Sequence, residues 1–60
     1  MSEYRFHLFK GFRSISEVEI IDCADDAAAA ALARHLLSER MHCGGIDVWR
    51  GWRSVYREER

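Results

Sequence analysis

Apolar residues recur at three- and four-residue spacing in one stretch of the chain, from Asp25 to Glu39. This spacing predicts an amphipathic helix. We expect Asp25 to be its N-cap, because a carboxylate can accept hydrogen bonds from the amides of the first helical turn. The Gly44-Gly45 pair ends any helical continuation. The apolar stripe contains Ala29, Leu32, Ala33, Leu36 and Leu37. A helix with one apolar stripe needs a sheet to pack on.

Residues 4–9 alternate in steps of two, which predicts a β-strand. Tyr4, Phe6 and Leu8 form one side of this strand. The other side still carries His7 and Phe9, so both sides of the strand contain side chains that other parts of the protein can bury. We therefore expect a central strand, followed by a hairpin turn over residues 10–14.

Residues 15–22 predict a second strand, with Val18 and Ile20 on one side. The other side carries Glu17, Glu19 and Ile21. Ile15 is out of phase with Val18, and a bulge near Ser16 or a later strand start would reconcile them. We expect Val18 and Ile20 to face the helix. The two glutamates would then face solvent and protect an edge of the sheet from further pairing.

A second hairpin follows the helix, with strands over residues 46–49 and 52–57 and a tight turn at Arg50-Gly51. A two-residue loop places Trp49 opposite Trp52, Val48 opposite Arg53 and Ile46 opposite Val55. In this register Ile46, Val48 and Val55 face the helix. Trp49, Trp52, Ser54 and Tyr56 face away from it.

The element order is therefore ββαββ, which predicts a single α+β domain over residues 1–60. A right-handed crossover through the helix gives a four-stranded antiparallel sheet of order 2-1-3-4, with the helix on one face. The expected core is Tyr4, Phe6, Leu8, Val18, Ile20, Ala29, Leu32, Ala33, Leu36, Ile46, Val48 and Val55.

Composition narrows the class of protein. The chain has 60 residues, of which 48% are hydrophobic and 32% are charged with mixed sign, so it is not a disordered tail. Its formal net charge of −1 provides no overall attraction to nucleic acid or to an anionic membrane. The longest apolar run, Ala27 to Ala33, is far too short to span a membrane, and the N-terminus lacks a signal-peptide core. We expect a cytoplasmic protein in which Cys23 and Cys43 are free thiols.

The sheet face away from the helix is the expected functional surface. Exposed aromatic patches are typical of interaction surfaces, and a small domain gains stability when a partner covers such a patch. We expect a non-enzymatic module that forms a homodimer or docks a protein partner there; an edge strand is the alternative interface. The expected interface residues are His7, Phe9, Trp49, Trp52 and Tyr56. Alternatively, the two tryptophans only stabilise the hairpin.

Single-stranded nucleic-acid binding is the alternative function, because such proteins stack bases on exposed aromatic side chains beside basic residues. Lys10-Gly11-Phe12 matches the start of an RNA-recognition signature, but it lies in an expected turn. Acidic residues on the same face would repel phosphates. The candidate phosphate contacts are Arg5, Arg13, Arg50, Arg53 and Arg57.

Metal binding and catalysis are weakly indicated. His35, His42 and Cys43 lack the spacing of a compact zinc module, and a fourth ligand would have to come from Cys23 or His7. Cys43 beside His42 could pair a nucleophile with a base, but no acid is placed to orient the base. We therefore expect no cofactor, no metal, no catalytic residue and no small-molecule substrate.

Three segments carry a resemblance to known proteins: YRFHLF, CADDAAAAALARHLL and DVWRGWRSV. Together they resemble a group of short uncharacterised bacterial proteins, of the alphaproteobacterial type, that share a YxFHL-like strand, a CxDDxxAA-type helix start and a VWxGxRxV-like hairpin. The resemblance covers nearly the whole chain and implies a cytosolic ββαββ protein without an assigned activity. Trp52 departs from the pattern, which has a small or polar residue there.

Overall fold

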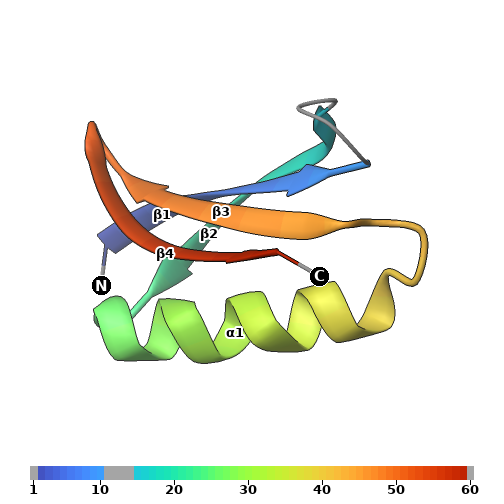
Figure 1. Cartoon of the computed structure of the whole chain (residues 1–60). Coiled ribbons are helices and arrows are strands. Elements are labelled where there is room, and N and C mark those ends of the chain that lie inside the picture. The colour runs from blue at the N-terminus through green and yellow to red at the C-terminus, as the bar shows by residue number, and fades with distance from the viewer. Residues whose placement is uncertain (1, 11–14, 60) are drawn as a thin grey trace.

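Two β-hairpins flank one helix along the chain (Figure 1). The computed structural model describes residues 2–10 and 15–59, apart from the side chain of Ser16. Its elements are β1 (Ser2–Phe9), β2 (Ile15–Cys23), α1 (Asp26–Glu39), β3 (Gly45–Arg50) and β4 (Arg53–Glu59). Residues 11–14 of the expected first turn lie outside the described residues.

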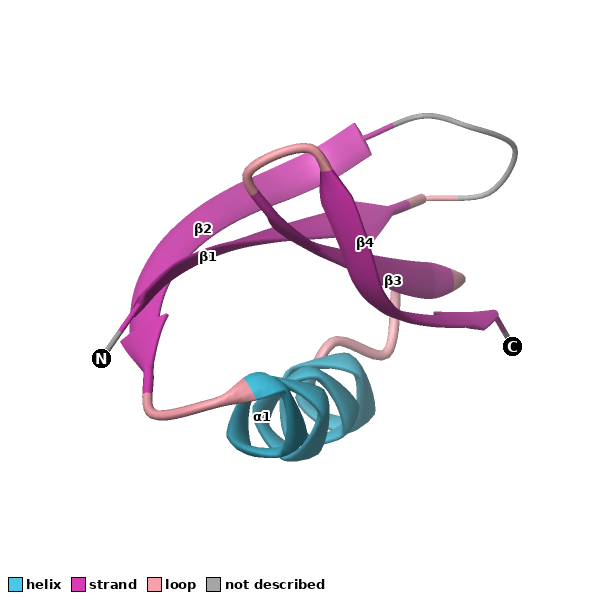
Figure 2. Ribbon diagram, turned by 90° about the vertical axis from the view of Figure 1, so that its left-hand side faces the viewer, coloured by secondary structure: helices cyan, strands magenta, loops and turns pink. Residues whose placement is uncertain are grey.

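The four strands form one antiparallel sheet in the order β2-β1-β3-β4. The connection from β2 through α1 to β3 passes over β1, which lies between these two strands. The helix runs beneath one face of the sheet, closest to β3 and β4 (Figure 2). The α+β class, the ββαββ order and the sheet order 2-1-3-4 are thus confirmed.

The helix begins where the sequence predicts. Asp25 has an extended backbone, and its carboxylate accepts a hydrogen bond of 2.8 Å from the amide of Ala28. At the other end Arg40 is the C-cap residue, and its amide donates to the carbonyl of Leu37 at 3.2 Å. The helical residues buried against the sheet are Ala29, Ala33, Leu36 and Leu37, with Leu32 partly buried beside them. The predicted apolar stripe is confirmed.

The core lies between α1 and the two central strands. Tyr4, Phe6 and Leu8 of β1 and Ile46 and Val48 of β3 have no exposed side-chain surface. They lie side by side, because Phe6 pairs with Val48 and Leu8 pairs with Ile46 across the two strands. Directly opposite residues of an antiparallel pair project to the same face. We call this face of the sheet the inner face.

The side-chain phase of β2 differs from the prediction. Tyr4 pairs with Ile21, so Ile21 projects to the inner face, and the same pairing places Glu17 and Glu19 there. Val18 and Ile20 instead project away from the helix and are 52% and 58% exposed. The predicted phase was wrong by one position, and in a strand a shift of one position exchanges the two faces. The predicted bulge is confirmed, because the pairing with β1 passes from Glu17 directly to Ile15.

The register of the second hairpin also differs from the prediction. Its loop is Gly51-Trp52, since Arg50 pairs with Arg53 and Gly51 has a positive φ of 62° that favours glycine. A register shift between Val48 and Trp49 then makes Val55 the extra residue of β4. The observed pairs are Trp49 with Ser54, Val48 with Tyr56 and Ile46 with Glu58, in place of the predicted partners Trp52, Arg53 and Val55.

The contrast between the two faces is testable by unfolding. Replacing buried Leu8 by alanine leaves a cavity in the core and should cost about 2 to 5 kcal/mol. Ile20→Thr retains a β-branched residue at an exposed position and should cost less than about 1 kcal/mol. Urea unfolding at low protein concentration measures both. A larger loss for Ile20→Thr than for Leu8→Ala would contradict the observed phase of β2.

Candidate interaction surface

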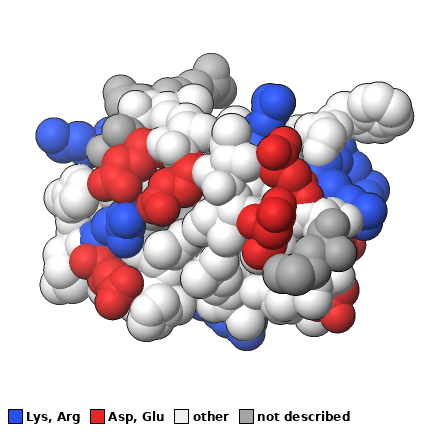
Figure 3. Space-filling view, turned by 180° about the vertical axis from the view of Figure 1, so that it is seen from behind, with Lys and Arg blue, Asp and Glu red and all other residues white. Residues whose placement is uncertain are grey.

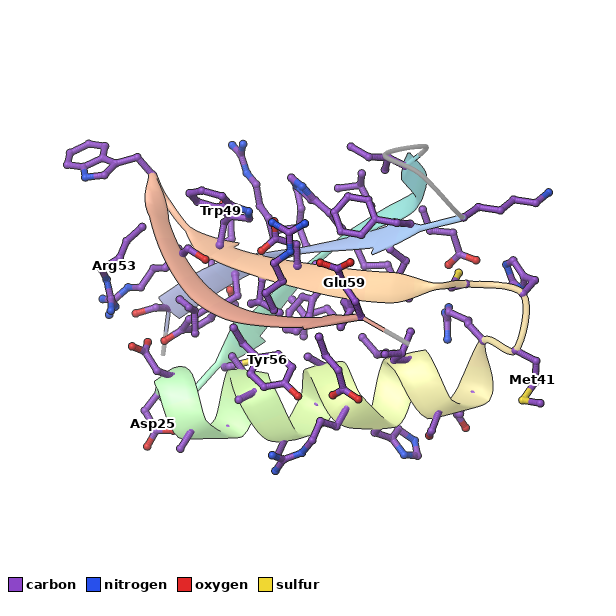
Figure 4. All side chains as sticks on the ribbon, in the orientation of Figure 1. Asp25, Met41, Trp49, Arg53, Tyr56 and Glu59 are labelled. Carbon is purple, nitrogen blue, oxygen red and sulfur yellow. The ribbon has the colours of Figure 1, made fainter. Side chains whose placement is uncertain are left out.

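The sheet face opposite the helix is the candidate functional surface, and we call it the outer face. Side chains project to it from all four strands, following the cross-strand pairs. In Figure 4 the labelled Trp49 lies above the sheet and the labelled Tyr56 lies below it, between the sheet and α1. The outer face carries Glu3, Arg5, His7, Phe9, Ile15, Val18, Ile20, Asp22, Asp47, Trp49, Ser54, Arg57 and Glu59.

Apolar side chains are exposed along one side of this face. Ile15, Val18 and Ile20 of β2 are 53%, 52% and 58% exposed. Phe9 on β1 and Trp49 on β3 are half-buried, and Arg5 lies between Trp49 and Ile20. Phe9 pairs with Ile15 across β1 and β2, so the apolar surface continues from the edge strand toward the centre of the sheet. Such a continuous apolar surface is characteristic of an interaction site.

The residues expected at the interface divide into three groups. His7, Phe9 and Trp49 lie on the outer face as predicted. Trp52 is 94% exposed at the loop of the second hairpin, away from the strands. Tyr56 was wrongly placed on the outer face: the shift at Val55 turns it to the inner face, where it packs against the core and its hydroxyl donates to the carboxylate of Glu58.

Sequence reasoning missed the apolar side chains of β2 on this surface. Val18 and Ile20 were assigned to the core because they are apolar and alternate. The available signal was Ile15, whose mismatch with Val18 indicated a bulge or a later strand start. The pairing of Val18 with His7 decides which side chains of β2 face the helix. The alternation of residues within one strand does not show how that strand pairs with another.

Asp47 is a buried carboxylate within the outer face. Its side chain is only 7% exposed, and its Oδ1 atom has no hydrogen-bond partner among the described residues. His7 lies directly opposite on β1 and Arg57 directly opposite on β4. Arg57, however, forms an ion pair of 3.3 Å with Glu59. A buried acceptor without a donor costs free energy, so Asp47 is an anomaly of this face.

The glutamates of β2 are bound at the end of the helix. Arg40 donates from Nε to Glu17 at 3.0 Å and from Nη2 to Glu19 at 2.9 Å. His42 lies 3.8 Å from the second oxygen of Glu17. These contacts explain how two acidic side chains can project to the inner face. They also join β2 to the C-terminal end of α1.

A second polar cluster joins the opposite end of the helix to the sheet. The hydroxyl of Tyr4 donates to Asp26 at 2.8 Å, and Arg53 donates to the same carboxylate at 3.0 and 3.3 Å. The hydrogen bonds from Arg53 and then from Tyr4 lower the pKa of Asp26. Arg50 lies over the Tyr4 ring, 6.0 Å from its centroid.

These contacts engage most of the arginines considered for nucleic-acid binding. Arg53 is paired with Asp26 and Arg57 with Glu59, while Arg50 lies over Tyr4. Arg5 is exposed on the outer face, and Arg13, like Gly11 and Phe12, lies outside the described residues. Figure 3 shows acidic side chains in separate groups with uncharged surface between them, and no continuous basic surface is visible from that side.

The cysteine and histidine candidates lie in different environments. Cys43 is 2% exposed within the core, whereas the side chain of the adjacent His42 is 54% exposed. Cys23 is also buried, and burial together with the charges of Asp22 and Asp25 raises the pKa of its thiol. Both cysteines are free thiols. Across residues 2–10 and 15–59, no group of three or more His, Cys, Asp or Glu side chains is placed to hold a metal ion.

The architecture defines a small ββαββ domain of the α+β class. The model of a protein family described as a domain of unknown function (DUF6894) matches residues 3–60, and the chain belongs to this family. Comparisons with curated proteins and with solved structures found no match. Within the part of the chain that the structure describes, no helix has the length and apolar character needed to cross a membrane.

The contacts of Asp26 lead us to expect that the stability of the fold decreases at acid pH. Because the pKa of Asp26 is lowered in the folded chain, its contribution is complete above the ordinary carboxyl pKa of about 3.9 and is lost as the pH falls through the lowered value. Asp26→Asn should therefore lower the Tm at neutral pH by several degrees and have little effect in strong acid. Thermal unfolding monitored by circular dichroism at both pH values measures this.

Asp25→Asn is the matched control, because asparagine caps a helix about as well as aspartate. Its Tm should stay close to that of the original chain at both pH values. An equal Tm difference for Asp26→Asn at neutral and strongly acidic pH would contradict the role of the ionised carboxylate.

Proposed function

We propose that this protein is a non-enzymatic interaction module whose outer face binds a protein surface, in the first place a second copy of the chain. The observation that carries the proposal is the exposure of Ile15, Val18 and Ile20 beside the half-buried Phe9, with the half-buried Trp49 on the same face. Burying such side chains releases about 25 cal/mol per Å² of apolar surface. The proposal includes no cofactor and no substrate, and it places the protein in the cytoplasm.

The dimensions of the molecule support self-association through a whole face. Its two longer extents are 30 and 21 Å, which correspond to a face of about 600 Å² in projection. A stable interface buries about 800 Å² of accessible surface on each partner. Since accessible surface exceeds projected area, a second copy covering the outer face would form an interface of ordinary size.

A charge introduced on the outer face should prevent association. Ile20→Glu places an ionised carboxylate in the apolar surface and should raise the dimer dissociation constant at least tenfold. Ala31→Glu introduces the same group on the exposed side of α1 and should leave the constant unchanged. Sedimentation equilibrium over a wide concentration range measures both. An original chain that remains a 7.0 kDa monomer at every concentration would overturn the proposal.

The two tryptophans report on the surface separately. In Trp52→Phe the remaining Trp49 lies on the outer face, so its quenching by acrylamide should decrease as protein concentration rises and the chains associate. In Trp49→Phe the remaining Trp52 lies at the exposed hairpin loop and should stay accessible throughout. Constant quenching of Trp49 in a sample that sedimentation shows to be dimeric would contradict an outer-face interface.

A further inference from the structure

We infer that β2 pairs with β2 of a second copy along its free edge, so that two sheets of four strands join into one antiparallel sheet of eight. The inference goes beyond the proposed function, which concerns the outer face and not the edge. In the described part of the chain, β1 is the only strand that pairs with β2. The opposite edge of β2 is therefore a template for a further strand.

The strand pairing shows which backbone groups point to this edge. The amide of Gly44 donates to the carbonyl of Phe9 at 2.8 Å, so the backbone groups of Phe9 point to β3. Successive residues of an antiparallel strand point these groups to opposite sides. Those of Leu8 therefore point to β2, where Leu8 pairs with Glu17. By the same alternation, three residues of β2 point their amides and carbonyls to the free edge: Val18, Ile20 and Asp22.

The usual protections of an edge strand are weak along β2. Charges, prolines and bulges keep exposed edges from pairing. The chain has no proline, and the bulge of β2 lies near its start, so the pairing with β1 is regular over residues 17–23. Glu17 and Glu19 project to the inner face, where Arg40 binds them both. The edge between the bulge and Asp22 is therefore regular and open to pairing.

The edge of β4 provides the contrast. Its bulge lies at Val55, within the strand and not at its end. Four of its seven residues are charged, namely Arg53, Arg57, Glu58 and Glu59. An interrupted and charged edge strand resists pairing. Of the two edges of the sheet, β2 is thus the one that favours a further strand.

The position of the apolar side chains indicates what that strand is. Ile15, Val18 and Ile20 form a row along β2, at one margin of the outer face, whereas β4 at the other margin carries polar and charged side chains. A two-fold axis perpendicular to the sheet at the free edge of β2 keeps both outer faces on one side. It brings two apolar rows side by side. The joined outer face then has an apolar centre and a polar rim, as protein interfaces have.

The helix and the charges both permit this pairing. α1 lies closest to β3 and β4, so the two helices lie apart beneath the joined sheet (Figure 2). Arg40 forms ion pairs of 3.0 and 2.9 Å with Glu17 and Glu19, so each copy brings a guanidinium together with its carboxylates. A strand of another protein would have to supply both an apolar row and a compensating charge. A second copy supplies them by symmetry, and the outer face stays free for the contact proposed above.

Hydrogen exchange resolved by residue tests the pairing in the original chain. The amides of Val18 and Ile20 should exchange rapidly in dilute solution and slow by at least about tenfold as the concentration rises and the chains associate. The amides of Arg57 and Glu59 point to the edge of β4 and are the internal control. They should exchange equally fast at both concentrations.

Two variants at one position separate the backbone contact from the side chain. Ile20→Pro removes an amide that β1 does not use, and proline is tolerated in strands at such edge positions. Ile20→Thr loses the same apolar side chain but keeps the amide. The dimer dissociation constant of Ile20→Pro should exceed that of Ile20→Thr at least tenfold, because symmetry removes the hydrogen bond twice. Sedimentation equilibrium measures both constants.

Arg57→Pro makes the same change at the edge of β4 and should leave the dissociation constant unchanged. Circular dichroism at low concentration checks that each variant is folded. If Ile20→Pro does not fold, hydrogen exchange in the original chain decides alone.

The results distinguish this inference from the proposed function. In an associated sample, unprotected amides of Val18 and Ile20 contradict the edge contact, while decreased quenching of Trp49 still supports the outer-face contact. Protected amides with unchanged quenching of Trp49 support the edge contact and contradict the proposed function. Equal constants for the folded Ile20→Pro and Ile20→Thr variants also contradict the edge contact. A chain that remains a 7.0 kDa monomer at every concentration contradicts both and leaves the edge to a strand of another protein.

Discussion

The packing of one helix against one face of the sheet determines the remainder of the structure. Five side chains of β1 and β3 are completely buried against the alanine and leucine stripe of α1. The 60-residue chain packs α1 against the inner face, and that is the face its core occupies. A small domain buries a limited fraction of its surface, so apolar side chains that project the other way remain exposed. The outer face is thus a direct consequence of the packing on the inner face.

Local patterns predicted the elements, because their causes are local. The carboxylate of Asp25 caps the helix next to it, and the alternation of Tyr4, Phe6 and Leu8 lies within one strand. The element order and the crossover then restrict the sheet to few topologies. This is why the sheet order and most of the core could be predicted from the sequence, including the central position of β1.

Pairing between strands explains what could not be predicted. The bulge at Ser16 was predicted, but the pairing of Val18 with His7 sets the phase of β2 and turns Val18 and Ile20 away from the helix. The extra residue at Val55 was not predicted, and it turns Tyr56 to the inner face. Glu17 and Glu19 face inward, and Arg40, more than twenty residues away along the chain, binds them both. Such a contact has no local signature.

Asp47 shows why a polar group within an apolar surface can determine orientation. Apolar contact is non-directional, so Ile15, Val18 and Ile20 would favour burial without selecting one arrangement of the partner. A buried carboxylate is different, because every arrangement that covers it without a donor leaves a charge unpaired at low dielectric. Only arrangements that bring a donor to Asp47 avoid this cost.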